Sequence, residues 1–463
     1  MILSVIDVLA RESTLFAAIW FAIGGLDDLL VDLIFGCRLL TCDVSQGRRP
    51  YRPDALESDS TAAPLIAVFV AAWDESAVID KMLRATLARF DYPNYRIYVG
   101  CYPNDLATIA AVQGVMLADP RVRIVVGSAP GPTTKAACLN AIWGAMRADE
   151  ACEGRVFAAV MLHDAEDIVH PCELAVVADL IDRYAAVQIP VLPLRHPDSL
   201  FVSGHYLDEF AEAHGKQLLV RQAIGAGLPL AGVGCAIRRD FMDAIAARRS
   251  GLPFDASSLT EDYELGLTIG AMGGRTILAR TTDPRTGDAV AVRAYFPHQV
   301  HAAIRQKARW MTGIALAGWD RTGWARSLHI GDHWMRMRDR RATLAIPVLV
   351  VAYGALILWI LSWTGHALFG GSAQSLSSTL QWILLMNAGL LAWRTAVRAL
   401  FVHRAYCWRE ALLSIPRTLV ANYISLFAAQ RALSLYIDIL AGAAPRWDKT
   451  AHHFPDDANL VGA

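Results

Sequence analysis

The sequence predicts an α/β domain built on a mostly parallel sheet, with transmembrane helices before and after it. Two observations carry this prediction. Short continuous apolar runs, typical of buried parallel strands, alternate with helical patterns through residues 64–162. Long uncharged stretches lie at both ends of the 463-residue chain, which is 54% hydrophobic and 19% charged, against about 45–50% and 25% in ordinary soluble domains.

The composition also excludes several classes of protein. The formal net charge is −1, which argues against nucleic acid as a partner, because phosphate contacts need a surplus of Lys and Arg. Intrinsic disorder is excluded because low hydrophobicity and high net charge are both missing. The eight cysteines are scattered and form no C-x-x-C pair, so a reducing compartment is indicated, with neither a disulfide framework nor a cysteine zinc site.

At the N-terminus, residues 1–40 are expected to hold one transmembrane helix, spanning 12–36, followed by a linker at 41–63. No basic region precedes the apolar run, so a cleaved signal peptide is not expected. Asp27, Asp28 and Asp32 fall in the C-terminal part of this helix. Acids at membrane depth are functional candidates, but these three can also mark the cytoplasmic exit of the helix or pair with Arg394 and Arg398.

The middle of the chain, residues 64–320, is expected to form the α/β domain. Apolar strands are predicted at 65–73, 95–101, 122–126 and 156–162, and helices at 75–90, 106–117 and 133–149. In such a sheet, ligands bind beyond the carboxyl ends of the strands. No G-x-G-x-x-G follows the first strand and no G-x-x-x-x-G-K-[ST] occurs, which disfavours an NAD-type site and a P-loop.

Acidic residues follow three of these predicted strands. They are Asp74 and Glu75 after the first strand, Asp105 after the second, and Asp164, Glu166 and Asp167 after the fourth. Carboxylates at one rim favour Mg²⁺ or Mn²⁺, and such an ion binds a diphosphate well. Taken singly, each acid has a second interpretation, because Asp is common in turns and at helix N-caps.

The C-terminal third returns to the membrane. A basic segment at 321–341 precedes predicted transmembrane helices at 342–365 and 378–402. Residues 411–442 are apolar but carry Arg417, Arg431 and Asp438, so this segment either spans or lies along the interface, and we favour the interface. A tail occupies 443–463. Basic residues flank the middle region and none lies in the loop at 365–378, which predicts a cytoplasmic domain.

Four signatures give this chain a resemblance to a known family. They are V-A-A-W-D-E at 70–75, H-D-A-E-D at 163–167, T-E-D at 260–262 and Q-K-A-R-W at 306–310. In this order they resemble the P-x-Y-N-E, D-x-D, T-E-D and Q-x-x-R-W motifs of membrane-bound family 2 glycosyltransferases with a GT-A fold, the kind that includes cellulose and hyaluronan synthases. With the tail R-W-D-K-T at 446–450, the chain is most similar to NfrB-like inner-membrane glycosyltransferases.

The resemblance implies a chemistry and a set of site residues. It implies an inverting transfer from a UDP-sugar, with Asp262 as the general base and Mg²⁺ or Mn²⁺ held by Asp164 and Glu166. Glu166 stands here at the second acidic position of the D-x-D motif. Its side chain is longer than that of Asp, which changes the geometry of metal binding, so Asp167 is an alternative ligand. Nucleotide-sugar contacts are expected from Asp74, Glu75, Asp105, Lys135, Asp164, Gln306, Arg309 and Trp310, and acceptor contacts from Glu261, Gly232 and Cys235.

Elementary chemistry agrees with several of these roles. Gln306 and Arg309 are three residues apart on a predicted helix and therefore share a face, where Arg309 can grip a diphosphate with two hydrogen bonds. Trp310 offers a flat face to a sugar, although an Arg-Trp pair before a membrane helix also serves as an interface anchor. Lys135 can also be a solvated helix lysine, and Asp262 an N-cap.

The expected partners are a UDP-sugar, a polysaccharide or lipid-linked acceptor, membrane lipids and an export or outer-membrane protein, with no nucleic acid. The expected location is the bacterial inner membrane. Two other functions stay open: a membrane-anchored oxidoreductase that uses a cofactor, and a non-catalytic scaffold or receptor component that kept the fold. Metal-dependent binding of UDP separates them, because the oxidoreductase excludes it and the scaffold does not need it.

Overall fold

The computed structural model describes residues 2–41, 63–325, 328–372, 375–443 and 453–455. The predicted linker lies almost wholly outside these residues, and with it Arg48, Arg49 and Arg52, three of the basic residues that flank the middle region. The tail sequence at 446–450 also lies outside them.

The centre of the domain is a seven-stranded sheet in the order β3-β2-β1-β4-β6-β5-β7. The strands are β1 (Ile66–Ala71), β2 (Tyr95–Cys101), β3 (Val122–Val126), β4 (Ala159–His163), β5 (Ala186–Gln188), β6 (Cys235–Arg238) and β7 (Thr276–Leu278). β1 pairs in parallel with β2 and β4, and β2 with β3, whereas β6 is antiparallel to both β4 and β5. The mostly parallel α/β sheet expected from the sequence is therefore confirmed.

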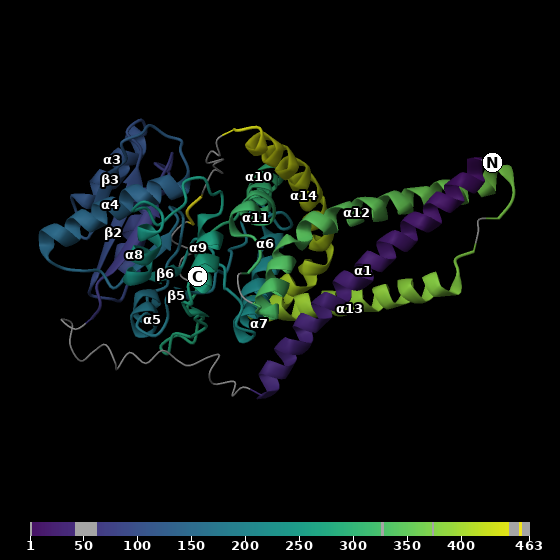
Figure 1. Ribbon diagram of the computed structural model, residues 1–463, viewed down its shortest axis with the longest axis horizontal. Coiled ribbons are helices and arrows are strands. Elements are labelled where there is room, and N and C mark those ends of the chain that lie inside the picture. The colour runs from purple at the N-terminus through teal and green to yellow at the C-terminus, as the bar shows by residue number, and fades with distance from the viewer. Residues whose placement is uncertain (1, 42–62, 326–327, 373–374, 444–452, 456–463) are drawn as a thin grey trace.

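Helices cover both faces of this sheet (Figure 1). One face buries side chains of α2 (Ile79–Arg89), α3 (Leu106–Met116) and α5 (Glu173–Leu180). The other buries side chains of α4 (Lys135–Glu153), α8 (Arg239–Ala247) and α9 (Glu261–Ala271). All six residues of β1 are buried, because both faces of a central parallel strand are covered. This burial explains why the sequence of β1 is apolar at every position.

Between the sheet and the long helices lies a connecting layer. It contains α6 (Gly204–Glu212), the π-helical turn η3 (Ala213–Gln217), α7 (Leu218–Ala223), α10 (Val300–Met311), the π-helical turn η4 (Thr312–Leu316) and α11 (Ala317–Thr322). In Figure 1 these elements separate the sheet from the bundle of long helices. The aromatic side chains of Tyr206, Phe210, Phe296 and Trp310 pack together within this layer, with ring centroids 4.9–6.4 Å apart.

Within the described residues, four helices are long and apolar enough to cross a membrane: α1 (Ile2–Thr41), α12 (Ile330–Phe369), α13 (Ser378–Ala405) and α14 (Trp408–Leu440). The first three run together away from the domain (Figure 1). The basic juxtamembrane segment predicted at 321–341 and the transmembrane helix predicted at 342–365 share one helix, because α12 already begins at Ile330. A helix can continue from water into an apolar layer without a break in its hydrogen bonds.

α14 differs from the other three long helices. It packs against α10, α6 and α13 and lies close to the domain in Figure 1. Arg417, in its N-terminal third, is completely buried and donates to the Leu200 carbonyl at 2.9 Å and to Asp208 at 3.1 Å. The orientation of α14 along the membrane interface stays a prediction.

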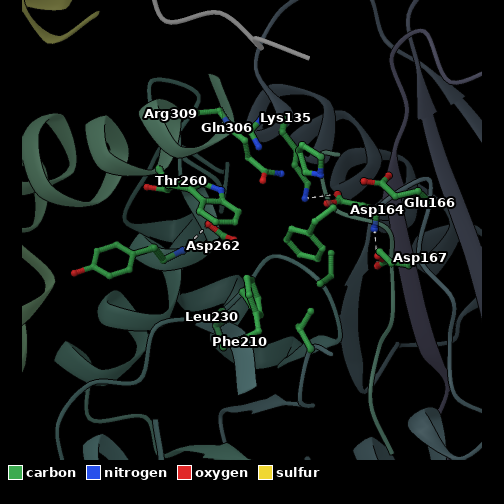
Figure 2. Close-up of a pocket in the computed structure, with 18 of the residues that line it drawn as sticks. Lys135, Asp164, Glu166, Asp167, Phe210, Leu230, Thr260, Asp262, Gln306 and Arg309 are labelled. Atoms are coloured by element: carbon green, nitrogen blue, oxygen red, sulfur yellow. Dashed lines mark hydrogen bonds and ion pairs between the residues drawn. The ribbon is translucent and has the colours of Figure 1, made fainter. Parts of the chain in front are cut away.

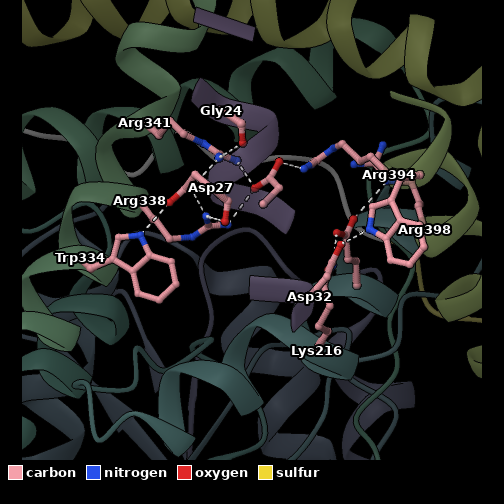
Figure 3. Close-up of polar contacts among 12 residues, drawn as sticks. Gly24, Asp27, Asp32, Lys216, Trp334, Arg338, Arg341, Arg394 and Arg398 are labelled. Atoms are coloured by element: carbon pink, nitrogen blue, oxygen red, sulfur yellow. Dashed lines mark hydrogen bonds and ion pairs between the residues drawn. The ribbon is translucent and has the colours of Figure 1, made fainter. Parts of the chain in front are cut away.

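Acidic residues of α1 form ion pairs with α12, with α13 and, through Asp32 and Lys216, with η3 (Figure 3). Asp27 and Asp28 pair with Arg338 and Arg341 of α12, and Asp28 also pairs with Arg394 of α13. The expected pairing with Arg394 is thus confirmed. The expected partner Arg398 was wrong, because its guanidinium bonds Glu212 of the domain at 3.3 Å.

Candidate active site

A cavity of about 340 Å³ opens at the carboxyl ends of the central strands. Its wall includes the turn after β4, the start of α4, the start of α9 and one face of α10. Figure 2 shows Asp262 across the cavity from Asp164, Glu166 and Asp167, with Lys135, Gln306 and Arg309 above it. The size and position are those of a ligand site in an open α/β sheet.

The turn after β4 is held by a buried histidine. His163 Nδ1 lies 2.9 Å from Asp167 Oδ2 and its Nε2 lies 3.2 Å from Glu173 Oε2. Burial by itself would lower the pKa of His163, but these two carboxylates raise it to about 10, so the ring is an imidazolium. Asp167 Oδ2 also accepts the Asp164 N–H at 3.0 Å. Asp167 therefore braces the turn that presents Asp164 and Glu166, and its Oδ2 is engaged there.

Lys135 is the cation nearest to the acidic turn. Thr134 caps α4 by accepting the Ala137 N–H, which places Lys135 at the first turn of the helix. Its Nζ lies 2.5 Å from Asp164 Oδ1. Burial by itself would lower the pKa of Lys135, but the carboxylates of Asp164, Glu261 and Asp262 raise it overall, so the ammonium stays charged.

Asp262 lies in the first turn of α9, where its Oδ1 accepts the Tyr263 N–H at 2.8 Å. Burial raises the pKa of Asp262 above its ordinary value, while Lys135 opposes the rise. Burial and the nearby Asp262 carboxylate raise the pKa of Glu261 to about 7. A buried carboxylate with a raised pKa is a better proton acceptor than a solvated one.

Two polar side chains of α10 carry an atom without a hydrogen-bond partner among the described residues. Gln306, Arg309 and Trp310 all line the cavity. Gln306 Oε1, Arg309 Nε and, on the loop before α9, Thr260 Oγ1 are buried and make no hydrogen bond within the described part of the chain. Because buried polar atoms are normally paired, these three atoms indicate a polar ligand. Trp310 packs with Tyr206, Phe210 and Phe296 inside the protein, so its ring is not a simple interface anchor.

The acids after β1 and β2 have structural partners. Asp105 caps α3 by accepting the Thr108 N–H at 3.2 Å, and its Oδ2 accepts the Asp74 N–H at 2.5 Å. Asp74 has a positive φ of 54°, which this bond helps to hold. Glu75 is buried and lines the cavity, whereas Asp74 and Asp105 lie beside it and do not form its wall.

The three residues expected to contact the acceptor differ in whether they reach the cavity. Glu261 lines the cavity. Gly232 adjoins the site, since its carbonyl is 3.5 Å from Lys135 Nζ and its φ is +75°. Cys235 does not reach the cavity: its side chain is fully buried in the core between the sheet and α4, α8 and α9, because inward and outward positions alternate along β6.

Several wall residues were missed from the sequence. His196, Phe210, His298 and His453 all line the cavity, and each comes from a segment without a recognisable pattern. His453 belongs to the C-terminal tail, which the sequence placed outside the domain. Only the T-E-D signature hinted at Thr260. Isolated histidines and phenylalanines carry no spacing signal, so only the tertiary fold brings them here.

A mostly parallel sheet whose strand ends present an acidic turn, facing the partly buried Asp262 carboxylate, is the arrangement expected of the GT-A glycosyltransferases that the four signatures resemble. Comparison with known proteins gives the particular family. A family model described as "Glycosyltransferase like family 2" matches residues 63–313. The chain belongs to this family.

The chain is also similar to individual proteins. It is 35% identical over 466 residues to Bacteriophage adsorption protein B of Escherichia coli K12, and equally to Bacteriophage N4 adsorption protein B of E. coli O157:H7. The match covers 95% of this chain and 61% of each relative. Among solved structures, a mannosyltransferase from Pyrobaculum calidifontis in complex with GDP-Man and Mn²⁺ superposes with a TM-score of 0.51 at 18% identity, over 84% of this chain and 97% of that one.

Proposed function

We propose that this glycosyltransferase is an inverting, metal-dependent enzyme that moves a sugar from a UDP-sugar to a growing surface polysaccharide or a lipid-linked acceptor. One observation carries the proposal. The partly buried carboxylate of Asp262 faces the acidic pair Asp164 and Glu166 across a single cavity (Figure 2). An inverting transfer needs a base on the face of the sugar opposite to the leaving group, and this arrangement supplies it.

Asp262 acts as the base in this scheme. It takes the proton from an acceptor hydroxyl as the hydroxyl oxygen bonds to C1 of the sugar. The bond between C1 and the phosphate oxygen breaks on the other side, and UDP leaves with its electron pair. The raised pKa of Asp262 suits this role, because a carboxylate whose pKa lies closer to 7 takes a proton more readily.

Asp164 and Glu166 would hold the divalent cation. Both carboxylates line the cavity at the end of β4, and hard oxygen ligands are those that Mg²⁺ and Mn²⁺ prefer. A bound ion would supply Lewis-acid stabilisation of charge on the diphosphate. The similar mannosyltransferase was solved with Mn²⁺. Lys135, which forms an ion pair with Asp164, would add a second positive charge beside the leaving group.

α10 would bind the donor from above. Arg309 Nε and Gln306 Oε1 point into the cavity region without a partner among the described residues. Arg309 would donate to the diphosphate, a charge-assisted contact stronger than a neutral hydrogen bond. Glu75 would bound the nucleoside side, with Asp74 and Asp105 shaping the adjoining turn.

The acceptor and the location follow from the surroundings of the site. The α1, α12 and α13 bundle adjoins the domain, so an acceptor carried on lipid or on a membrane-bound chain could reach the cavity. We place the domain on the cytoplasmic side of the bacterial inner membrane, where nucleotide sugars are made. The relatives' name as adsorption proteins fits a product displayed at the cell surface, which requires an export partner.

The test is UDP release by the full chain in detergent micelles, with a panel of UDP-sugars, GDP-Man as a comparison, and Mg²⁺ or Mn²⁺. Asp262→Asn should lower turnover by about 10²–10⁴-fold. Asp240→Asn is the matched control, because Asp240 also sits in the first turn of a helix and accepts the next N–H, at 2.7 Å, but lies outside the cavity.

Turnover with one donor, abolished by EDTA and by Asp262→Asn but kept by Asp240→Asn, supports the proposal. Equal loss in both variants would remove the special role of Asp262. Absence of both turnover and UDP binding across the panel would favour the scaffold function.

A further inference from the structure

Three histidines from separate segments meet at the wall of the cavity. His196 follows β5, His298 precedes α10 and His453 lies in the C-terminal tail. One ring nitrogen of each lies within 4.8 Å of the others. None of them belongs to a signature that carried the family resemblance, and none has a role in the proposed transfer.

We propose that His196, His298 and His453 form a second cation site, selective for a transition metal of the Zn²⁺ or Co²⁺ type, which ties the C-terminal tail to the rim of the cavity. Three imidazoles with an open fourth position are a common ligand set for such ions. The acidic pair Asp164 and Glu166 offers hard oxygens instead. The two sites would therefore sort two classes of cation.

The polar contacts around His196 suit a metal ligand. His196 Nδ1 now accepts the Asp198 N–H at 3.2 Å. A cation on Nε2 would move the ring proton to Nδ1, and Asp198 Oδ2, 3.8 Å from Nδ1, can turn to accept it. Carboxylates commonly support metal-binding histidines in this way.

Closing the site needs a local rearrangement. The rings of His196 and His298 are stacked, with centroids 4.1 Å apart and planes at 14°, whereas ligand lone pairs must converge on one point. His298 must therefore rotate out of the stack. It is only partly buried, and among the described residues no hydrogen bond or ion pair restrains its ring. His453 is exposed, which leaves it room to follow.

The tail has a fixed anchor beside this site. Phe454 packs against the core on the α2, α3 and α5 side of the sheet, and Pro455 is buried. His453 precedes this anchor directly and lies at the cavity wall. A cation shared by His453 with His196 and His298 would cross-link the tail to two loops of the domain and narrow the opening.

The test uses Co²⁺ as the probe, with the full chain in detergent, free of any histidine tag and in excess Mg²⁺. The readout is the visible ligand-field absorption of bound Co²⁺, which needs no sugar donor and no activity. We expect one Co²⁺ per chain, with affinity reduced at least about 10-fold in His298→Gln and in His453→Gln. His301→Gln is the matched control, because His301 is exposed on α10 and outside the cavity.

A second readout follows the tail itself. Zn²⁺ should slow hydrogen exchange in the peptide that contains His453 in the unaltered chain, but not in His298→Gln, although residue 298 is far away in sequence. Co²⁺ binding that is equal in the histidine variants and in His301→Gln would overturn the proposal. Binding lost in Asp164→Asn would also overturn it, because the histidines would then complete the acidic site and form no second one.

Discussion

Replacing Gly232 by alanine should displace the proposed base without unfolding the protein. A Cβ at Gly232 would lie 3.2 Å from Asp262 Cγ and closer still to Oδ2, inside the 3.4 Å at which ordinary contact begins. The carboxylate must then move by about 1 Å, and a displacement of that size at a reacting group costs about 10²-fold in rate. The positive φ of 75° at Gly232 adds about 1–2 kcal/mol of destabilisation for any L-residue.

Gly154→Ala separates these two effects. Gly154 caps α4 with a φ of +63°, and a Cβ there would meet no atom within 4 Å. Both variants should therefore lose similar stability, measured as the thermal unfolding temperature in detergent, while UDP release falls about 100-fold in Gly232→Ala alone. If Gly232→Ala kept the turnover of Gly154→Ala, Asp262 would not be the base, or its position would not limit the reaction.

Three further predictions test the donor contacts, the packing of α14 and the response to pH. Arg309→Lys should raise the donor KM about 10–100-fold, because lysine keeps the charge but loses the planar fork. The control Arg305→Lys, four residues earlier on α10, should leave the donor KM unchanged. If the two variants had the same donor KM, Arg309 would not contact the donor. Arg417→Met should lower the free energy of unfolding by about 3–5 kcal/mol, because Asp208 is left buried without its cation. Arg409 is exposed on the same helix, so the control Arg409→Met should change the unfolding temperature little. Burial, assisted by Arg280, lowers the pKa of His214 to about 4, so the unfolded chain binds more protons than the folded chain between pH about 6.5 and 4. The unfolding temperature should therefore fall as the pH is lowered through that range. His214→Asn should weaken this pH dependence, and an unchanged pH dependence in the variant would contradict the prediction.

The sequence predicted the sheet well where the signal was local. Residues 95–101 and 122–126 were predicted as strands with the bounds that the structure gives, because a strand buried on both faces is apolar at every position. The strands β5, β6 and β7 are three or four residues long, too short to show a period, and none was predicted. Their pairing, including both antiparallel contacts of β6, depends on tertiary packing.

The candidate site shows the same division. The signatures correctly brought Asp164, Glu166, Asp262, Gln306 and Arg309 to one cavity, because each signature fixes a residue at the end of a strand or on the start or face of a helix. Cys235 does not line this cavity, because its side chain follows the pleat of β6 into the core. The support that His163 and Glu173 give to the acidic turn could not be predicted, since neither spacing nor residue type marks a buried ion pair in advance.

The acids of α1 connect the membrane bundle to the cavity in a way that neither interpretation from sequence anticipated. Asp32 lies 2.5 Å from Lys216 of η3, and Lys216 also pairs with Glu212 at 2.9 Å. Phe210 and His214, on the same continuous α6 and η3 segment, form part of the cavity wall. Breaking a buried ion pair is costly because the remaining charge stays desolvated, so Asp32 fixes this wall to the helix that anchors the protein. Asp32 therefore has a structural role, and what it holds in place is one wall of the cavity.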